Sequence, residues 1–246
     1  MKLLQGLIVP VALVCVSCAQ PEAVRPAPEE RSAPPPVERA SSMPEPSATA
    51  LAATAPRIVF LGDSLTAGYG LAKEESVPSL IQKRLKDAGY PYEVVNAGVS
   101  GDTSAGGLSR LDWSLSGDVK ILVIELGAND GLRGLPVAGM KQNLTEIITR
   151  ARARDISVIL TGMEAPPNFG AAYTSEFRNV YRQLAKEHDV TFVPFFLDGV
   201  AGIPNLNIAD GMHPNAEGSR IVEKTIWSAL EPLLGARAGD RKHPGR

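Results

Sequence analysis

The stretch RIVFLGDSLTAGYG at residues 57–70 is the starting point for predicting the fold. It begins with a short run of β-branched, aliphatic and aromatic residues, which is typical of a strand that is buried on both faces. A turn rich in glycine follows at once. Ser64 is therefore expected just beyond the carboxyl end of a buried strand, where open α/β sheets carry their ligand-binding loops.

Further short apolar runs follow along the chain, and segments with helical periodicity separate them. The predicted strands are Arg57–Leu61, Tyr92–Asn96, Ile121–Glu125, Ile156–Leu160 and Thr191–Val193. Apolar side chains share one helical face at Val77/Leu80/Ile81/Leu85, Val137/Met140/Leu144/Ile147/Ile148, Tyr173/Phe177/Val180/Tyr181/Leu184 and, in a last helix opened by Pro214, Val222/Ile226/Leu230/Leu233. Because parallel neighbours need crossover connections, this alternation predicts an α/β fold with three layers (α/β/α) and a five-stranded, mostly parallel sheet.

Three kinds of site are considered for the turn after the first strand. A phosphate-binding P-loop needs a Lys before the Ser or Thr that ends the glycine loop, and this turn has none. The glycine spacing also differs from that of a dinucleotide-binding G-x-G-x-x-G turn. The third is a serine nucleophile, in which Gly62 lets the backbone bend and Ser64 is exposed at the strand end.

A serine nucleophile needs a base within hydrogen-bond distance. Of the three histidines, His243 lies in a charged tail at residues 237–246, and His188 lies near the end of a predicted helix, where solvation or the helix dipole accounts for it. His213 follows Asp210 by three residues, so the carboxylate could hold the imidazole. The same segment before a helix is also typical of capping, and on its own it does not decide between the two roles.

Four short segments together resemble the motifs of the GDSL, or SGNH, hydrolase family. Gly62-Asp63-Ser64-Leu65 matches the first motif letter for letter, and Asp210-Gly211-Met212-His213 is similar to the last. The segment NAGVSG at 96–101 is similar to the second motif, and GAND at 127–130 is similar to the third. Each motif alone is weak evidence, but all four occur in order, and the similarity extends from Arg57 to about Leu234.

The resemblance implies a flavodoxin-like SGNH hydrolase fold for a domain at residues 57–236. It implies that Ser64, Asp210 and His213 are the catalytic residues. Ser64, Gly98 and Asn129 would supply the oxyanion hole, which stabilises the negative oxygen formed when serine attacks an acyl carbonyl. Two alternatives stay open: Gly98 as a turn glycine with positive φ, and Asn129 as a cap of the turn before Leu132.

Several longer segments resemble one branch of the family, which contains arylesterases, acyl-CoA thioesterases and lysophospholipases. They are residues 96–115, 125–135, 162–170 and 194–202. The third of these follows the fourth predicted strand, and the resemblance implies that it contacts the acyl chain. The candidates for an apolar acyl wall are Leu132, Leu135, Met163 and Phe169, each of which could also serve ordinary packing.

Three carboxylates near these motifs are expected to be structural. Asp63 and Asp130 should accept backbone N–H bonds that fix tight loops, because no further acidic or His ligand accompanies them at metal-binding spacing. Glu125, at the end of an apolar strand, should be structural as well. We therefore expect no metal and no cofactor.

Composition limits the partners that the chain can take. Its 246 residues carry a formal net charge of −2, and the sequence pI is about 6.0. This composition supplies no basic excess for nucleic acid, so we expect no nucleic-acid partner, and the sequence gives no sign of an obligate protein partner. Cys15 and Cys18 are the only cysteines, so we expect no disulfide in the domain.

The N-terminal region is predicted to direct the chain out of the cytoplasm. Residues 1–19 have the pattern of a signal peptide, with Lys2 before an apolar run too short to span a bilayer. An ordinary signal peptidase would release a soluble protein that begins at Gln20. Val16-Ser17-Cys18 instead resembles a bacterial lipobox that ends in lipidated Cys18, and we expect this membrane-anchored, periplasm-facing lipoprotein although Cys15 stands where Leu is usual.

Residues 20–56 are rich in Pro and Ala and are predicted to be a disordered tether. Extended polyproline geometry would let it hold a domain up to about 100 Å from the anchor. The leading hypothesis is thus an extracytoplasmic serine esterase for small acyl-ester or lipid substrates, namely aryl esters and lysophospholipids, with thioesters as a further option. The alternatives are a carbohydrate or cell-wall O-acetyl esterase and a catalytically silent binding protein on the same fold.

Overall fold

One parallel sheet organises the part of the chain that the computed structural model describes, residues 55–235. Its strands are β1 (Arg57–Gly62), β2 (Glu93–Gly98), β3 (Val119–Glu125), β4 (Ser157–Thr161) and β5 (Thr191–Val193). They lie in the order β2-β1-β3-β4-β5, and all four pairs are parallel. The predicted five-stranded sheet is confirmed, and its strand order is that of flavodoxin-like folds.

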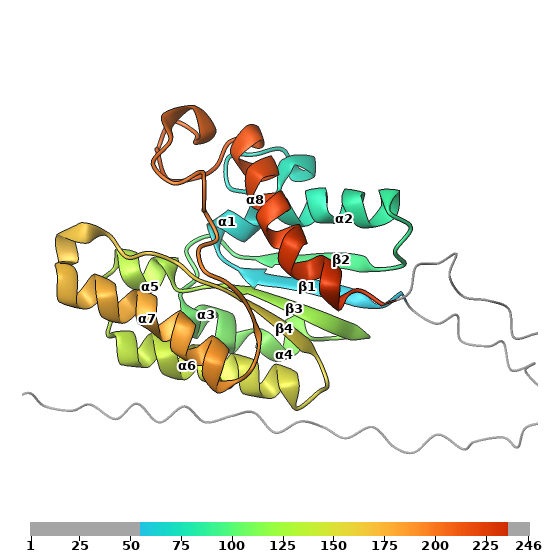
Figure 1. Ribbon diagram of the computed structural model, residues 1–246, viewed down its shortest axis with the longest axis horizontal. Coiled ribbons are helices and arrows are strands. Elements are labelled where there is room, and N and C mark those ends of the chain that lie inside the picture. The colour runs from blue at the N-terminus through green and yellow to red at the C-terminus, as the bar shows by residue number, and fades with distance from the viewer. Residues whose placement is uncertain (1–54, 236–246) are drawn as a thin grey trace, which may run out of the picture. The chain divides into compact units, whose positions relative to one another are not determined.

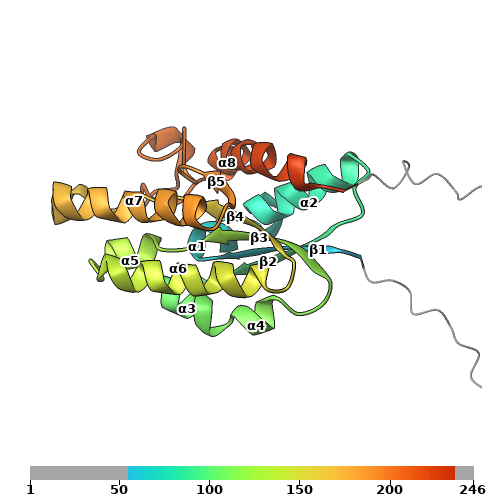
Figure 2. The same ribbon diagram turned by 60° about the horizontal axis from the view of Figure 1, so that its bottom comes forward.

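Helices cover both faces of this sheet (Figures 1 and 2). The α-helices are α1 (Ser64–Ala67), α2 (Val77–Asp87), α3 (Ser104–Ser109), α4 (Leu111–Ser114), α5 (Ala128–Leu132), α6 (Val137–Arg152), α7 (Ala171–Glu187) and α8 (Ala216–Leu230). Short 3₁₀ turns are η1 (Lys73–Glu75), η2 (Pro167–Phe169), η3 (Pro204–Leu206) and η4 (Glu231–Leu233). Helix α2 packs against α8, and α6 packs between α3 and α7. A transmembrane span would need a longer and more apolar helix than any found in residues 55–235.

The core lies between the sheet and these helices. Ile58, Val59, Phe60 and Leu61 of β1 are each at most 1% exposed, as expected for a central strand covered on both faces. Helix α6 buries the apolar face that its sequence predicts, from Val137 to Ile148. Burial of this kind is the main stabilising contribution to such a domain.

The start of the last helix differs from the prediction. We expected Pro214 to open it, but α8 begins at Ala216, and Asn215 caps it with a side-chain oxygen that accepts from Glu217 N and Gly218 N. Pro214 instead forms an antiparallel bridge with Asn207. The capping bonds of an Asn side chain satisfy helix amides that lack an intrahelical partner, and this fixes where the helix starts.

Three strand ends meet at one level of the sheet. Gly62, the last residue of β1, pairs with Gly98 on β2 and with Glu125 on β3. The loops that carry Ser64 and Asn129 therefore leave the same edge of the sheet, beside the end of β2. In the observed strand order this edge includes the switch point between β1 and β3, where open α/β sheets bind ligands.

Candidate active site

The turn after β1 is tight because of Gly62. A Cβ at this residue would lie 2.0 Å from Thr66 Oγ1, so a larger residue would force the turn open. Asp63 accepts a hydrogen bond of 3.0 Å from Leu65 N with its side chain and so caps α1. Ser64 is the first residue of α1, a position whose backbone N–H has no partner within the helix.

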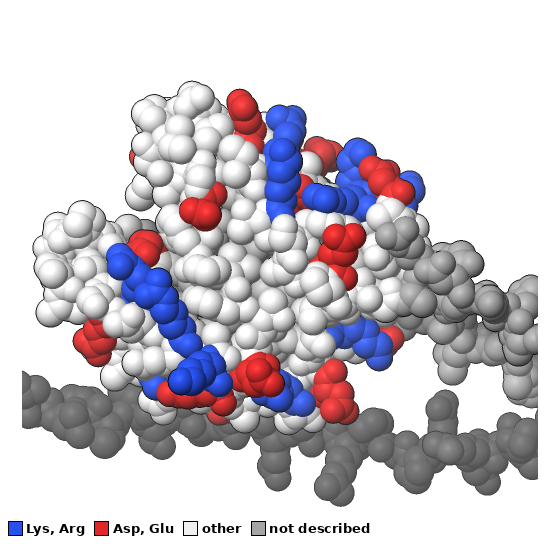
Figure 3. Space-filling view, viewed as in Figure 1, with Lys and Arg blue, Asp and Glu red and all other residues white. Residues whose placement is uncertain are grey.

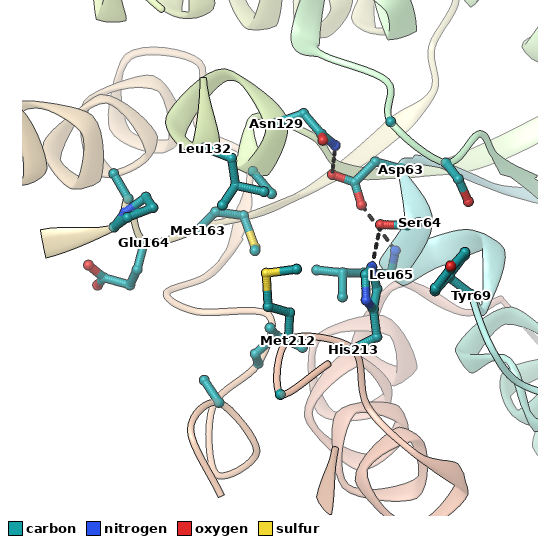
Figure 4. A pocket seen from close by; sticks show the side chains of 18 of the residues that line it. Asp63, Ser64, Leu65, Tyr69, Asn129, Leu132, Met163, Glu164, Met212 and His213 are labelled. Carbon is teal, nitrogen blue, oxygen red and sulfur yellow. Dashed lines mark hydrogen bonds between the residues drawn. The ribbon is translucent and has the colours of Figure 1, made fainter. Parts of the chain in front are cut away.

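Ser64, His213 and Asp210 form a continuous chain of hydrogen bonds. Ser64 Oγ lies 2.9 Å from His213 Nε2, and His213 Nδ1 lies 2.6 Å from Asp210 Oδ2 (Figure 4 shows the first contact). The other oxygen, Asp210 Oδ1, accepts from Met212 N at 2.9 Å and His213 N at 3.1 Å. These backbone bonds, chiefly that from Met212, lower the pKa of Asp210 to about 2. Asp210 therefore holds both its own loop and the imidazole, whereas the cap of α8 is Asn215.

The loop that carries Asp210 and His213 is closed at its stem. Ile208 N donates to His213 O at 2.8 Å, next to the bridge between Asn207 and Pro214. Asn207 is buried, and its amide donates to Val200 O and Ile203 O at 2.9 and 2.8 Å. These bonds fix the carboxylate and the imidazole relative to each other before any substrate binds.

Tyr69 is a part of the site that the sequence did not lead us to expect. Its ring lies against that of His213, with centroids 4.7 Å apart. Gly68 and Gly70 flank it with φ of 81° and 78°, values that favour glycine. A Cβ at Gly70 would lie 2.8 Å from Ile208 Cδ1. An aromatic residue between two glycines in the loop after a strand is the signal that could have identified it.

Gly98 packs against α1, and turn geometry is not what requires a glycine there. It is not among the glycines with positive φ, so that alternative is wrong. A Cβ here would lie 2.3 Å from Ala67 N, which means that only glycine lets the end of β2 contact α1. In this structure the Gly98 N–H donates to Asn96 Oδ1 at 3.0 Å.

Asn129 lies inside α5 and lines the same cavity as Ser64. Its amide donates to Asp63 Oδ2 and to Asp102 O, both at 3.0 Å, and Figure 4 shows the first of these bonds. The N-cap of α5 is Gly127, so the alternative that Asn129 caps this turn is wrong. Because the backbone oxygen of Asp102 can only accept, it fixes which end of the Asn129 carboxamide is the NH₂ group.

Two carboxylates are buried beneath the Ser64 turn. Glu125 Oε2 accepts from Asp63 N at 3.2 Å and from Thr66 Oγ1 at 2.8 Å. Burial raises the pKa of both Glu125 and Asp63, and the neighbouring Asp63 charge raises that of Glu125 further, to well above its usual range. Glu125 therefore holds its proton more tightly than a solvent-exposed glutamate does.

The contacts of Asp63 and Asp130 agree with the structural roles predicted for them. Asp63 accepts the backbone bond from Leu65, and Asp130 accepts from Ser104 N and Ser104 Oγ, both at 2.7 Å. Asp130 thereby ties α5 to the start of α3. In residues 55–235 no group of three or more His, Cys, Asp or Glu side chains is arranged to hold a metal ion.

A cavity of about 540 Å³ opens beside Ser64 and His213. Its wall is mainly apolar and includes Leu65, Leu132, Met163, Phe195, Leu197 and Met212, several of which Figure 4 labels. The structure thus brings two of the predicted wall residues, Leu132 and Met163, into the cavity. Phe195, Leu197 and Met212 were missed, although they lie in or next to segments that carry the family resemblance.

Leu135 and Phe169 do not line this cavity. The Phe169 ring packs on Tyr173, with centroids 5.4 Å apart, and it fills the space where a Cβ of Gly134 would stand. Tyr173 Oη donates to Leu135 O at 2.8 Å. These residues join the loop after α5 to the start of α7, so in this structure their contacts are with each other.

The cavity carries no positive charge on its described wall, because none of the described lining residues is Lys or Arg. Its carboxylates are Asp63 and Glu164, and Arg178 pairs with Glu164 through two bonds of 2.6 Å. Figure 3 shows that the lobe between β5 and α8 has few charged side chains on the face in view.

The family follows from a comparison of the whole chain with family models. The model described as the GDSL-like lipase/acylhydrolase family matches residues 60–221, which include all four motifs. The chain belongs to this family. The predicted family and the predicted fold are both confirmed.

Relatives of this GDSL-family chain agree with the assignment. It is 45% identical over 183 residues to esterase TesA of Pseudomonas aeruginosa, covering 74% of this chain and 91% of the relative. It is 39% identical over 175 residues to an arylesterase of Vibrio mimicus, covering 71% and 88%. A crystal structure of TesA superposes with a TM-score of 0.69 at 44% identity and covers 73% of this chain and 99% of that one.

Proposed function

We propose that this protein is a serine esterase that cleaves acyl esters through an acyl-enzyme on Ser64. The observation that carries the proposal is the chain of hydrogen bonds from Asp210 through His213 to Ser64, with Ser64 opening into an apolar cavity. A hydroxyl bonded to an imidazole, which a carboxylate orients in turn, is the arrangement that activates serine for acyl transfer.

The residues divide the reaction between them. His213 Nε2 takes the proton of Ser64 as Oγ attacks the acyl carbonyl, and it then gives that proton to the departing alcohol. Water then attacks the acyl carbonyl as it loses a proton to His213. His213 returns this proton to Ser64 Oγ as the bond between Oγ and the acyl group breaks and the acid leaves. Asp210 stays ionised throughout, because its pKa of about 2 lies far below the working pH, and it stabilises the imidazolium.

The negative oxygen of each intermediate is bound by Ser64 N–H, Gly98 N–H and the Asn129 amide in this proposal. Gly98 and Asn129 now donate to Asn96 Oδ1, Asp63 Oδ2 and Asp102 O. The oxyanion therefore has to share or replace these internal acceptors. A fully charged oxygen competes better for a donor than a neutral one, which favours the transition state over bound substrate.

The cavity suits an apolar acyl chain joined to a neutral or zwitterionic leaving group. Its wall is apolar, and its described part offers no cation to pair with the phosphates of acyl-CoA. Aryl esters and lysophospholipids are therefore the proposed substrates, and simple thioesters can react by the same steps. The arylesterase relative supports the first of these classes.

A serine-directed fluorophosphonate tests the proposal directly. We expect it to label the wild-type protein and Ser100→Ala, a control in which another serine of the same cavity is removed. Ser64→Ala should not be labelled and should lose turnover of p-nitrophenyl esters. Labelling that survives Ser64→Ala would contradict the proposal, and hydrolysis of aryl ester, lysophospholipid and acyl-CoA side by side would order the substrates.

We further propose that the protein is a membrane-anchored lipoprotein outside the cytoplasm, with a signal peptide at 1–19, lipidated Cys18 and a tether at 20–56. These segments and the tail at 237–246 lie outside the described residues. Cys18→Ser should move the protein from the membrane fraction to the soluble fraction and leave ester turnover unchanged. Cys15→Ser is the matched control and should stay in the membrane fraction. Equal fractionation of the two variants would contradict the proposal that Cys18 anchors the protein.

A further inference from the structure

Arg110 lies between α3 and α4 and is both the C-cap of α3 and the N-cap of α4. Its side chain is only 18% exposed, and it does not line the cavity beside Ser64. The guanidinium makes three bonds, and each goes to a different segment of the site. A planar group with five fixed N–H donors is suited to holding several acceptors at once.

Two of these bonds go to the ends of neighbouring strands. Arg110 Nη2 donates to Gly62 O at 2.8 Å, and Nη1 donates to Ala97 O at 2.7 Å. Gly62 leads into the Ser64 turn, and Ala97 directly precedes Gly98. One cation therefore links the end of β1 to the end of β2.

The bond to Ala97 O acts on the proposed oxyanion donor itself. The carbonyl of Ala97 and the N–H of Gly98 belong to one peptide group, whose atoms are coplanar. A guanidinium on the carbonyl oxygen fixes the plane of this peptide. It also draws electron density from the N–H, so that Gly98 becomes a stronger donor to an oxyanion.

The third bond reaches the segment that holds Asn129. Arg110 Nε donates to Asp102 Oδ2 at 2.6 Å, and the backbone oxygen of Asp102 accepts from the Asn129 amide. The Asp102 carboxylate occupies the space where a side chain of Gly106 would stand, since a Cβ there would lie 2.7 Å from Asp102 Oδ1. Asp102 is thus fixed from two sides, and it fixes Asn129.

We propose that Arg110 is a positioning residue that holds the three oxyanion donors in their common geometry. It acts through Gly62 on the Ser64 turn, through Ala97 on Gly98 and through Asp102 on Asn129. The inference rests on the proposed function, because it concerns how that site stabilises its transition state. It adds a residue outside the four motifs, which neither contacts the substrate nor exchanges a proton with it.

The test is the split between kcat and KM for a soluble p-nitrophenyl ester. Arg110→Ala should lower kcat by about 10²-fold, the size expected when an oxyanion donor is lost, and should change KM by less than about threefold. Arg110→Lys keeps a positive charge but replaces the planar fork by a single ammonium, so kcat should fall in that variant too. Added guanidinium ion should restore part of the turnover of Arg110→Ala.

Arg84→Ala is the matched control. Arg84 also pairs with a carboxylate, Glu223 at 3.1 Å, and stacks on Trp227 at 4.4 Å, but it joins α2 to α8 away from the cavity. This variant should lower the melting temperature and leave kcat unchanged. If Arg110→Ala and Arg84→Ala have the same kcat, or if guanidinium restores nothing, Arg110 is only structural and the inference is overturned.

Two further comparisons remove ambiguity. If Arg110→Ala does not fold, Arg110→Lys decides, and wild-type kcat in that folded variant overturns the inference. The double variant with Asn129→Ala should lose less activity than the product of the single losses, because both changes act on the same donors. Failure of the proposed function would look different, since wild-type Ser64 would then not react with the fluorophosphonate at all.

Discussion

The ring of Tyr69 covers the imidazole of His213, with centroids 4.7 Å apart and ring planes inclined by 43°. Tyr69 comes from the turn after β1 and His213 from the loop before α8, so the contact joins the segment of the proposed nucleophile to that of the proposed base. It restricts rotation of the imidazole out of line with Ser64. Tyr69 is itself 53% exposed, and it also lines the cavity beside Ser64.

The first prediction concerns this contact. Tyr69→Ala should lower kcat/KM for a soluble ester by about 3- to 10-fold, the range that corresponds to the loss of one aromatic pair. Tyr69→Phe keeps the ring and should stay close to wild type. Trp113→Ala removes an aromatic that is 74% exposed on α4 and serves as the control. Equal kcat/KM in Tyr69→Ala and Trp113→Ala would mean that the ring does not orient His213.

The second prediction concerns Asp210. Asp210→Asn keeps the shape of the side chain but removes its charge. The group that faces His213 Nδ1 becomes either a neutral amide oxygen or an NH₂ group. We therefore expect kcat to fall by about 10⁴-fold in a folded protein. Circular dichroism checks the fold and ester hydrolysis checks the rate. Turnover near the wild-type value would show that another group orients His213.

The lowered pKa of Asp210 also predicts how the stability of the protein changes in acid. Its pKa is lowered from 3.8 to about 2 in the folded protein, so its charge stabilises the fold above the unfolded value. That contribution is lost as the pH falls from about 4 through 2. The difference in melting temperature between wild type and Asp210→Asn should therefore shrink over this window. A difference that stays constant between pH 5 and pH 2 would argue against it.

The third prediction concerns buried Glu125. Its pKa is raised by burial and then by Asp63, so the folded protein keeps a proton that the unfolded chain releases above about 4.5. Stability should consequently fall as the pH rises from that value through the folded-state pKa. Glu125→Gln cannot ionise and still offers an oxygen to Asp63 N and Thr66 Oγ1. The difference in unfolding free energy between this variant and wild type should therefore shift in favour of the variant from pH 5 to pH 8.

Urea unfolding at the two pH values measures this change. Glu125→Ala is the informative comparison, because it leaves the buried donors of Asp63 and Thr66 without an acceptor. It should lose about 1–3 kcal/mol for each unsatisfied group at either pH. The same pH slope in wild type and Glu125→Gln would mean that Glu125 does not hold the proton.

The fourth prediction separates two leucines of one loop. Leu132 lines the cavity and Leu135 does not, although both are partly exposed, at 49% and 37%. Leu132→Ala should reduce kcat/KM for an octanoyl ester more than for an acetyl ester, since each buried CH₂ is worth about 0.8 kcal/mol. Leu135→Ala should leave the ratio of the two esters unchanged. The reverse pattern would place the acyl chain outside this cavity.

The sequence predicts best the features that depend on local pattern. The buried run of β1 and the glycine turn that contains Ser64 both follow from neighbouring residues, and so does the approximate position of every strand. The need for crossovers predicted a mostly parallel sheet, and the family resemblance implied its flavodoxin-like order; the structure adds that all four pairs are parallel. The boundaries shifted by one or two residues, as at the end of β2, where pairing of Gly98 with Gly62 extends the strand.

What the sequence could not supply depends on contacts between distant segments. Arg110 and the oxygen of Gly62 are 48 positions apart, and no periodicity connects them. For Gly98 the sequence offered turn geometry as an alternative to the oxyanion role, whereas the structural constraint is the backbone of α1 against which it packs. Phe169 looked like a wall residue because it is aromatic in a binding loop, but its direction depends on where Gly134 and Tyr173 lie.

Ser64 and His213 are separated by 149 positions, although their side chains share a hydrogen bond. The loop of His213 closes on itself through its own short-range bonds, and it can take shape early. Its meeting with Ser64, in contrast, requires β1 to be seated in the sheet and α8 to be packed against α2. Closing so long a segment is slow because its chain entropy is lost before the contact forms. Recovery of ester turnover during refolding therefore reports the last stage of assembly. It should lag behind the recovery of the helix and strand signals in circular dichroism.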